Sequence, residues 1–207
     1  MPAKYVLSGT GTGIGKTLAA AALMLGLDAS YWKPVQCGTE KETDTQTLRR
    51  FTGLPVDRFL PEAYVFKAAL SPHRAAELEN KTIEVEKLHP PACERMLIIE
   101  GAGGLLVPLT RQALMADLFA RWQIPLILCA RTELGTLNHT LLSLEAMRAR
   151  KIPLHGILFL GAPNDDNKRT IAAFSGARVL GHIPVIEAIT RENLGTAFAQ
   201  NLDKNAF

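Results

Sequence analysis

A glycine-rich stretch near the start of the chain, Gly9-Thr-Gly-Thr-Gly-Ile-Gly-Lys-Thr17, constrains the fold more than any other feature. The apolar run Tyr5–Leu7 precedes it and the apolar run Leu18–Leu25 follows it. The sequence therefore predicts a strand, a loop and a helix, which is the order that a phosphate-binding loop requires. Glycines let successive backbone N–H groups face one anion, and the helix start adds its positive dipole end. We expect a nucleoside triphosphate site, in which Lys16 contacts the β- and γ-phosphates and Thr17 ligates Mg²⁺.

The loop departs from the ordinary pattern of a glycine, four residues and then Gly-Lys-Ser/Thr. Thr10 stands where the first glycine of that pattern would lie. Gly11 stands where the related partition-type ATPases carry a second lysine. The loop is thus a variant, but the predicted strand before it and helix after it still indicate a phosphate site.

Size and composition favour one α/β domain that spans residues 1–207, with 47% hydrophobic and 21% charged residues. The net charge of +3, without a dense basic run, gives no indication of a nucleic-acid partner. No apolar run reaches the roughly 18–20 residues of a membrane span, and no signal peptide is evident. We therefore expect a cytoplasmic protein that binds no membrane. Three widely spaced cysteines and five histidines without ligand spacing predict neither a disulfide framework nor a zinc site.

Strand-like and helix-like segments alternate along the chain. We expect strands near 4–8, 30–35, 96–100, 125–130, 155–160 and 178–182, and helices near 16–27, 43–52, 111–122, 136–150, 167–175 and 191–202. The interior strands are continuously apolar, which is typical of strands covered by helices on both faces. The alternation predicts a single doubly wound, mostly parallel α/β sheet flanked by helices, with a P-loop NTPase-like fold. Segment 54–92 contains five prolines and interrupts the alternation, so we expect loops and short helices there.

Ligands of such sheets bind beyond the carboxyl ends of the strands, so polar residues at those ends are candidates for chemistry. Lys33 ends the second predicted strand, where a cation would stabilise charge that develops in phosphoryl transfer. Glu100 ends an apolar strand before a predicted Gly-Ala-Gly-Gly turn, at a position suited to a metal-binding carboxylate. Asp44 is compatible both with a metal ligand and with an ordinary helix-start residue. Cys37 has no evident base partner, so we do not predict a nucleophile there.

A set of segments, in order along the chain, resembles the dethiobiotin synthetases, ligases of the biotin pathway. These segments are Ser8–Thr17, Tyr31–Gln36, Asp44 between its threonines, Ser71–His73, Ile99–Gly104, Leu134–His139 and Gly181–Pro184. The resemblance implies a homodimer that joins CO₂ to 7,8-diaminononanoate, with Mg²⁺ and with ATP or another nucleoside triphosphate as co-substrate. One amine captures CO₂ as a carbamate, and the γ-phosphoryl group then gives a carbamic-phosphoric anhydride. The second amine closes the cyclic urea and expels phosphate.

The resemblance also implies roles for individual residues. Lys16, Lys33 and Thr12 would act in catalysis, and Thr17, Asp44 and Glu100 would hold Mg²⁺. The nucleotide would contact Gly13, Ile14, Gly15, Lys16, Thr17, Glu100, Gly103, Gly181, Ile183, Pro184 and Glu187. The other substrates would contact Thr12, Lys33 and Cys37 and, from the neighbouring subunit, Leu134, Gly135 and Asn138.

The chain departs from this family at three places. Cys37 stands where the family often has a small hydroxyl residue, and Leu160 where many members have an asparagine-containing segment that contacts adenine. The link Leu25–Ser30 between the first helix and the second strand is short.

Two other classes stay open, namely an ATP-dependent amide synthase of corrin biosynthesis and a partition-type ATPase switch. The first needs a glutaminase portion, for which 207 residues leave no space. Lys33 and the missing lysine at Gly11 argue against the second.

Overall fold

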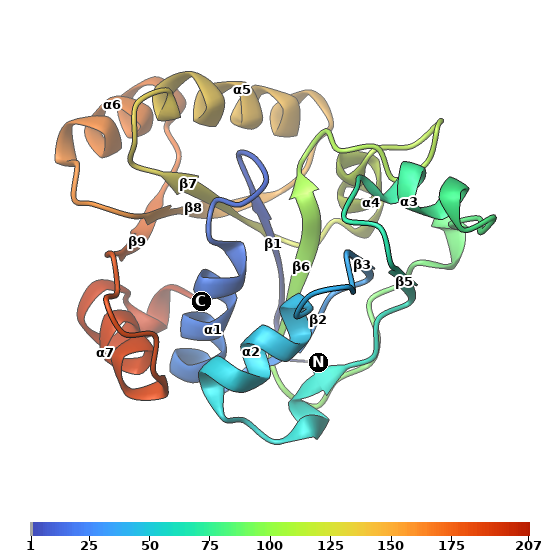
Figure 1. Ribbon diagram of the computed structural model, residues 1–207. Helices are drawn as coiled ribbons and strands as arrows, with labels where there is room; N and C mark the ends of the chain where they lie inside the picture. The colour runs from blue at the N-terminus through green and yellow to red at the C-terminus, as the bar shows by residue number, and fades with distance from the viewer. Residues whose placement is uncertain (1) are drawn as a thin grey trace.

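The fold is a seven-stranded sheet with helices on both faces, seen in a computed structural model that describes residues 2–207 (Figure 1). Every strand pair is parallel, and the spatial order is β4-β2-β6-β1-β7-β8-β9. The strands of this sheet are β1 (Lys4–Gly9), β2 (Ser30–Trp32), β4 (Phe59–Leu60), β6 (Leu97–Gly104), β7 (Leu126–Arg131), β8 (Leu154–Leu160) and β9 (Val179–Ile183). The predicted α/β class and parallel sheet are confirmed.

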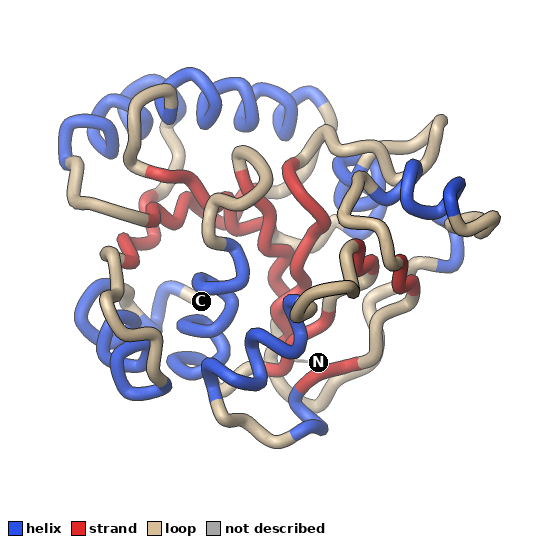
Figure 2. The backbone as a smooth tube through the Cα atoms, in the orientation of Figure 1, coloured by secondary structure: helices blue, strands red, loops and turns tan. Residues whose placement is uncertain are grey.

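Helices enclose the sheet because its strands bury side chains on both faces. Along β1, Leu7 packs into the layer of α1, α2 and α7, whereas Val6 packs into the layer of α3 to α6. Figure 2 shows the strands between these two groups of helices. The helices are α1 (Lys16–Leu27), α2 (Asp44–Thr52), α3 (Pro72–Leu78), α4 (Met115–Trp122), α5 (Thr136–Ala149), α6 (Asp165–Ser175) and α7 (Arg191–Asn201), with 3₁₀ turns at Val56–Arg58, Val85–Lys87 and Lys204–Ala206.

The predicted strand at 30–35 is two strands. Pro34 has no N–H to donate to a ladder, so β2 ends at Trp32 and the chain starts again as β3 (Val35–Cys37). β3 pairs in parallel with β5 (Tyr64–Phe66) in a separate two-stranded sheet. The expectation of only loops and short helices over 54–92 is therefore wrong, because this segment also contributes the short strands β4 and β5.

The predicted Gly-Ala-Gly-Gly turn after Glu100 is also wrong. β6 continues to Gly104, and Gly104 pairs with Gly9 of β1 across a register shift. A Cβ at Gly104 would lie 3.2 Å from the Gly9 carbonyl oxygen, so the glycine serves close approach of two strands rather than a turn. The helix predicted at 111–122 begins later, at Met115, because Thr110 Oγ1 accepts hydrogen bonds from the N–H groups of Gln112 and Ala113 and holds a turn there.

The link between α1 and β2 is as short as expected. Asp28 ends α1 in a left-handed conformation, and β2 starts at Ser30. Over residues 2–207, no helix combines the length and the apolar character that crossing a membrane requires. The short link places the end of β2 beside β6 and close to the loop after β1, which positions the site described below.

Two helical glycines separate the effect of packing from that of helix propensity. A Cβ at Gly26 of α1 would collide with the buried ring of Phe198 of α7, whereas a Cβ at Gly195 of α7 would meet nothing within 4 Å. Gly26→Ala should therefore lower the free energy of unfolding by about 1–3 kcal/mol through overpacking. Gly195→Ala should raise it by about 0.5–1 kcal/mol through lost chain entropy in the unfolded state. Urea denaturation measures both, and a Gly26→Ala protein more stable than the wild type would contradict the packing of α1 on α7.

Candidate active site

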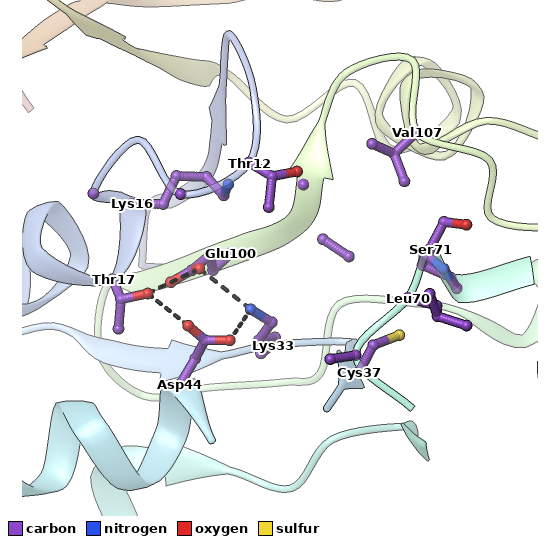
Figure 3. Close-up of a pocket in the computed structure, with 16 residues that line it drawn as sticks. Thr12, Lys16, Thr17, Lys33, Cys37, Asp44, Leu70, Ser71, Glu100 and Val107 are labelled. Carbon is purple, nitrogen blue, oxygen red and sulfur yellow. Dashed lines mark hydrogen bonds and ion pairs between the residues drawn. The ribbon is translucent and has the colours of Figure 1, made fainter. Parts of the chain in front are cut away.

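A cavity of about 620 Å³ opens where β1, β2 and β6 end (Figure 3). Residues from several separate segments line it, namely the loop after β1, the start of α1, the residue after β2, β3, the start of α2, the turn before α3, β6 and the loop after β6. The carboxyl edge of a parallel sheet is the usual ligand site of this architecture. The structure therefore brings together Thr12, Lys16, Thr17, Lys33, Asp44 and Glu100, as the sequence predicts.

The loop after β1 has the backbone of an anion cradle. Gly13 and Gly15 adopt φ angles of +69° and +101°, which L side chains rarely tolerate. Gly15 caps α1 without a side-chain hydrogen bond, so the first N–H groups of the helix stay free for a ligand. Lys16 is buried, and its Nζ donates to the Gly11 carbonyl oxygen over 3.4 Å. Burial lowers the pKa of Lys16, while the charge of Glu100 acts in the opposite direction.

A buried cluster of charges, made of Lys33, Asp44 and Glu100, lies beside this loop. Lys33 Nζ pairs with Asp44 Oδ2 and, over 3.3 Å, with Glu100 Oε1. Thr17 Oγ1 donates to Asp44 Oδ1 over 2.6 Å and lies 3.5 Å from Glu100 Oε1 (Figure 3). The Glu100 side chain is 1% exposed and that of Asp44 is 28% exposed, so Asp44 forms the side of the cluster nearer to solvent.

The cluster favours the charged forms of Lys33 and Asp44. Burial alone would lower the pKa of Lys33, but Glu100 and Asp44 together hold it above its ordinary value. Burial alone would raise the pKa of Asp44, but the Lys33 ammonium and the hydrogen bonds from Lys33, Thr17 and Gln36 hold it below its ordinary value. Burial, followed by the charge of Glu100, raises the pKa of Tyr31 well above its ordinary value, so its protonated hydroxyl donates to Glu100 Oε2 over 3.0 Å.

Asp44 does not cap its helix. The cap is Thr43, whose side chain accepts from the Gln46 N–H, while the Gln46 side-chain oxygen accepts from the Thr43 N–H. Asp44 is the next residue, and its carboxylate points to Thr17 and Lys33. The helix-start interpretation of Asp44 therefore does not account for its side chain, which is free to take part in the site.

The oxygen atoms of Thr17, Asp44 and Glu100 fit a hard divalent cation. Mg²⁺ is usually bound by one or two carboxylates together with water and substrate phosphates. Thr17 directly follows Lys16 at the start of α1, so its hydroxyl faces the same side of the cavity as the glycine-rich loop. Within residues 2–207, no group of three or more His, Cys, Asp or Glu side chains could hold a metal ion on its own.

Some of the other predicted residues line this cavity, and the rest lie outside it. Cys37 and Gly103 line it, and a Cβ at Gly103 would lie 3.3 Å from Thr12 Oγ1. Leu134, Gly135 and Asn138 do not line it, because they lie on the loop after β7 and in the first turn of α5, with Leu134 fully exposed. Outside it too are Ile14, whose side chain is buried against Gly9, and the four residues Gly181, Ile183, Pro184 and Glu187 in and after β9.

The sequence alone does not identify every side chain of the site. Tyr31 donates to Glu100, and the side-chain oxygen of Gln36 accepts from the Asp44 N–H over 3.3 Å. Tyr31 lies two residues before Lys33, and this spacing within a strand is the one signal that could have paired them. Ser71 and Val107 also line the cavity, and the Ser71 hydroxyl lies 3.1 Å from His73 Nδ1. Val107 lies in the loop after β6 and carries no signal of a site in the sequence.

The Cys37 thiol should react slowly although it faces the cavity. Burial, only partly offset by Lys33, raises its pKa to about 11. At pH 8 its alkylation by iodoacetamide should therefore be roughly 100-fold slower than that of a free thiol of ordinary pKa. Mass spectrometry of the peptide that contains Cys37 measures the rate, with Cys37→Ser to identify the signal. A rate that levels off between pH 8 and 9 would contradict the raised pKa.

Comparisons with known proteins agree with this geometry. A family model described as an AAA domain matches residues 3–193. The curated ATP-dependent dethiobiotin synthetase BioD of Agrobacterium fabrum is 55% identical over 98% of this chain and 96% of its own length. The enzymes of the same name from Rhodopseudomonas palustris and Sphingopyxis alaskensis are 52% and 50% identical, over 100% and 97% of this chain and 98% and 96% of their own lengths.

Solved structures are similar at the level of the fold. A ParA family ATPase from Chlorobium tepidum superimposes with a TM-score of 0.50 and 13% identity, over 97% of this chain and 93% of that one. The MinC:MinD cell division complex of Aquifex aeolicus gives a TM-score of 0.50 and 11% identity, over 94% and 86%. These structures share the architecture, whereas the curated relatives share the sequence along almost its whole length. This chain belongs to the ATP-dependent dethiobiotin synthetase family.

Proposed function

We propose that the cavity at the carboxyl edge of the sheet is where this ligase joins CO₂ to 7,8-diaminononanoate and closes the ring of dethiobiotin, at the expense of ATP. The observation that carries the proposal is the meeting of Lys16, Lys33, Thr17, Asp44 and Glu100 in one cavity beside the glycine-rich loop. The relatives that share half of the sequence are ATP-dependent synthetases by name. The single-domain organisation and the cytoplasmic location remain predictions.

The chemistry needs positioning and charge stabilisation rather than a nucleophile on the protein. One amine of the diamine attacks CO₂, loses a proton and becomes a carbamate. The carbamate oxygen then attacks the γ-phosphorus of ATP, and ADP leaves. Lys16 and Lys33 face the path of this transfer and offset the negative charge that develops on the phosphoryl oxygens. The second amine attacks the carbonyl carbon of the mixed anhydride and expels phosphate, and Thr12 lines this side of the cavity.

Thr17, Asp44 and Glu100 would hold Mg²⁺ between the protein and the triphosphate. Bound there, the ion neutralises the charge of the β- and γ-phosphates. Asp44 carries the more exposed carboxylate of the two and is paired with Lys33. We infer that Lys33 leaves Asp44 when nucleotide is present, since the γ-phosphate then gives the ammonium a second anion within the same cavity.

We propose a homodimer in which Leu134, Gly135 and Asn138 of one subunit complete the diamine site of the other. Two features support it. An apolar groove of about 380 Å³ borders the active cavity and shares Thr12 and Val107 with it. Exposed leucines cluster near this groove, and Leu106, Leu134 and Leu142 are each at least half exposed. A second subunit that covered this face would bury these leucines. It would also bring its own Leu134 loop toward the active cavity of the first subunit.

We assign the base of the nucleotide to the outer part of the sheet edge, near the ends of β8 and β9. Gly181, Ile183, Pro184 and Glu187 come from this region, and Leu160 lies at the end of β8. A Cβ at Gly15 would lie 3.3 Å from Leu160 Cδ1, so the glycine-rich loop and the end of β8 are neighbours. A nucleotide whose phosphates lie on the loop would then extend its base toward Leu160.

The two alternative classes are less well supported. Likeness to the ParA family ATPase and to the MinC:MinD complex rests on 13% and 11% identity and extends to the fold alone. The synthetase relatives are 49–55% identical over 93–98% of their own lengths, which leaves no room for the extra glutaminase portion of a corrin-pathway amide synthase.

Labelled bicarbonate tests the proposal directly. Purified protein with ATP, Mg²⁺ and the diamine should convert the label into an acid-stable cyclic urea, with one ADP formed per urea. Lys16→Ala should lower the rate on the order of 10²-fold or more, because it removes a cation that stabilises the transferring phosphoryl group. Arg95→Ala, a change of equal charge at the opposite end of the sheet, serves as the matched control. ATP hydrolysis that proceeds equally fast without the diamine, together with no urea, would refute the proposal.

A further inference from the structure

Arg131 makes a contact with the glycine-rich loop that none of the roles above uses. It is the last residue of β7, which lies beside β1 in the sheet (Figure 1). Its Nη2 donates a hydrogen bond to the Gly13 carbonyl oxygen, and its Nη1 donates to Glu133 Oε2 over 3.3 Å. The side chain therefore joins the end of one strand to the turn of a loop that lies 118 residues earlier in the chain.

The side of Gly13 on which a side chain would lie is open. Its φ of +69° is in the left-handed region, and a Cβ there would find no heavy atom within 4 Å. No packing on the Gly13 side therefore fixes the orientation of the peptide between Gly13 and Ile14, although the Ile14 side chain is buried. Because a trans peptide is planar, with its carbonyl and N–H on opposite sides, a Gly13 carbonyl turned toward Arg131 turns the Ile14 N–H away from the guanidinium. A phosphate cradle depends on the directions of such N–H groups.

Surface pairing alone does not account for Arg131. Its side chain is 46% exposed and that of Glu133 is 68% exposed, and exposed ion pairs contribute little to stability. A hydrogen bond from a charged donor to a carbonyl contributes more. The planar guanidinium reaches two acceptors at once, the Gly13 carbonyl and the Glu133 carboxylate, which the single ammonium of a lysine cannot do in the same geometry.

We propose that Arg131 is a positioning residue for the nucleotide, because it holds the Gly13–Ile14 peptide in the orientation in which the loop receives the triphosphate. This inference rests on the nucleotide site proposed above and adds a residue outside its cavity. The inference predicts a selective effect on the two substrates. Loss of Arg131 weakens the binding of ATP and leaves the binding of the diamine unaffected, since the hydrogen bond that is lost holds the glycine-rich loop.

Calorimetry with a non-hydrolysable ATP analogue and steady-state kinetics test the inference together. Arg131→Ala should raise both the Kd of the analogue and the KM for ATP about tenfold, the usual effect of losing one hydrogen bond to a charged group. The KM for the diamine and kcat should change by less than about twofold, because no group that contacts the diamine is lost. Arg131→Lys should behave like Arg131→Ala, since the charge remains but the two-acceptor geometry does not.

Arg95→Ala is the matched control, because Arg95 is 50% exposed, is paired with Asp28 and precedes β6 at the far end of the sheet. It should bind the analogue like the wild type. Three outcomes would overturn the inference: unchanged analogue binding in Arg131→Ala, complete rescue by Arg131→Lys, or an equal rise in the KM for the diamine. If the wild type bound the analogue but made no cyclic urea, the proposed function would fail while the binding test of Arg131 remained decisive.

Discussion

The pairing of one buried lysine with two carboxylates is the interaction on which the rest of the site depends. Lys33 contacts both Asp44 and Glu100 with only 7% of its side chain exposed. Without the ammonium, the buried Glu100 carboxylate would lie near that of Asp44 with no cation between them, and a buried charge that loses its partner costs about 3–5 kcal/mol. The cluster joins the end of β2, the start of α2 and the middle of β6, so it also fixes the relative positions of the segments that form the cavity.

Strand order explains how these groups meet. β6 lies between β1 and β2, and all three strands run in the same direction, so the glycine-rich loop after β1, Lys33 after β2 and Glu100 within β6 come to one place. Pro34 then ends the pairing of β2 and turns the chain toward α2, where Thr43 caps the helix and leaves Asp44 free. The result is an arrangement in which carboxylates suited to a cation and lysines suited to a triphosphate share one cavity. Arrival of both ligands would redistribute these pairings rather than build a new site.

Elements that depend on neighbouring residues could be predicted from the sequence, whereas elements that depend on pairing between distant segments could not. The strand, loop and helix around Lys16 follow from residues adjacent in sequence, and so do the helix and strand positions from β7 onward. Lys33 and Glu100 could be assigned to the site by the topology rule for parallel sheets, although Glu100 lies within β6 rather than at its end. The extension of β6 to Gly104 could not, because it depends on pairing with β1, some 95 residues away in the register Gly9↔Gly104. Asp44 stayed ambiguous because capping and metal binding favour the same residue type, and only the position of Thr43 separates them.

The most direct test of the central role of this cluster is a crystal structure with Mg²⁺ and a non-hydrolysable ATP analogue. The account predicts the ion about 2.0–2.1 Å from Thr17 Oγ1, with oxygen atoms of Asp44 and Glu100 in its coordination sphere directly or through water. It also predicts that Lys33 no longer pairs with Asp44. An ion bound to phosphates and Thr17 alone, while Lys33 keeps both of its carboxylate partners, would contradict the account.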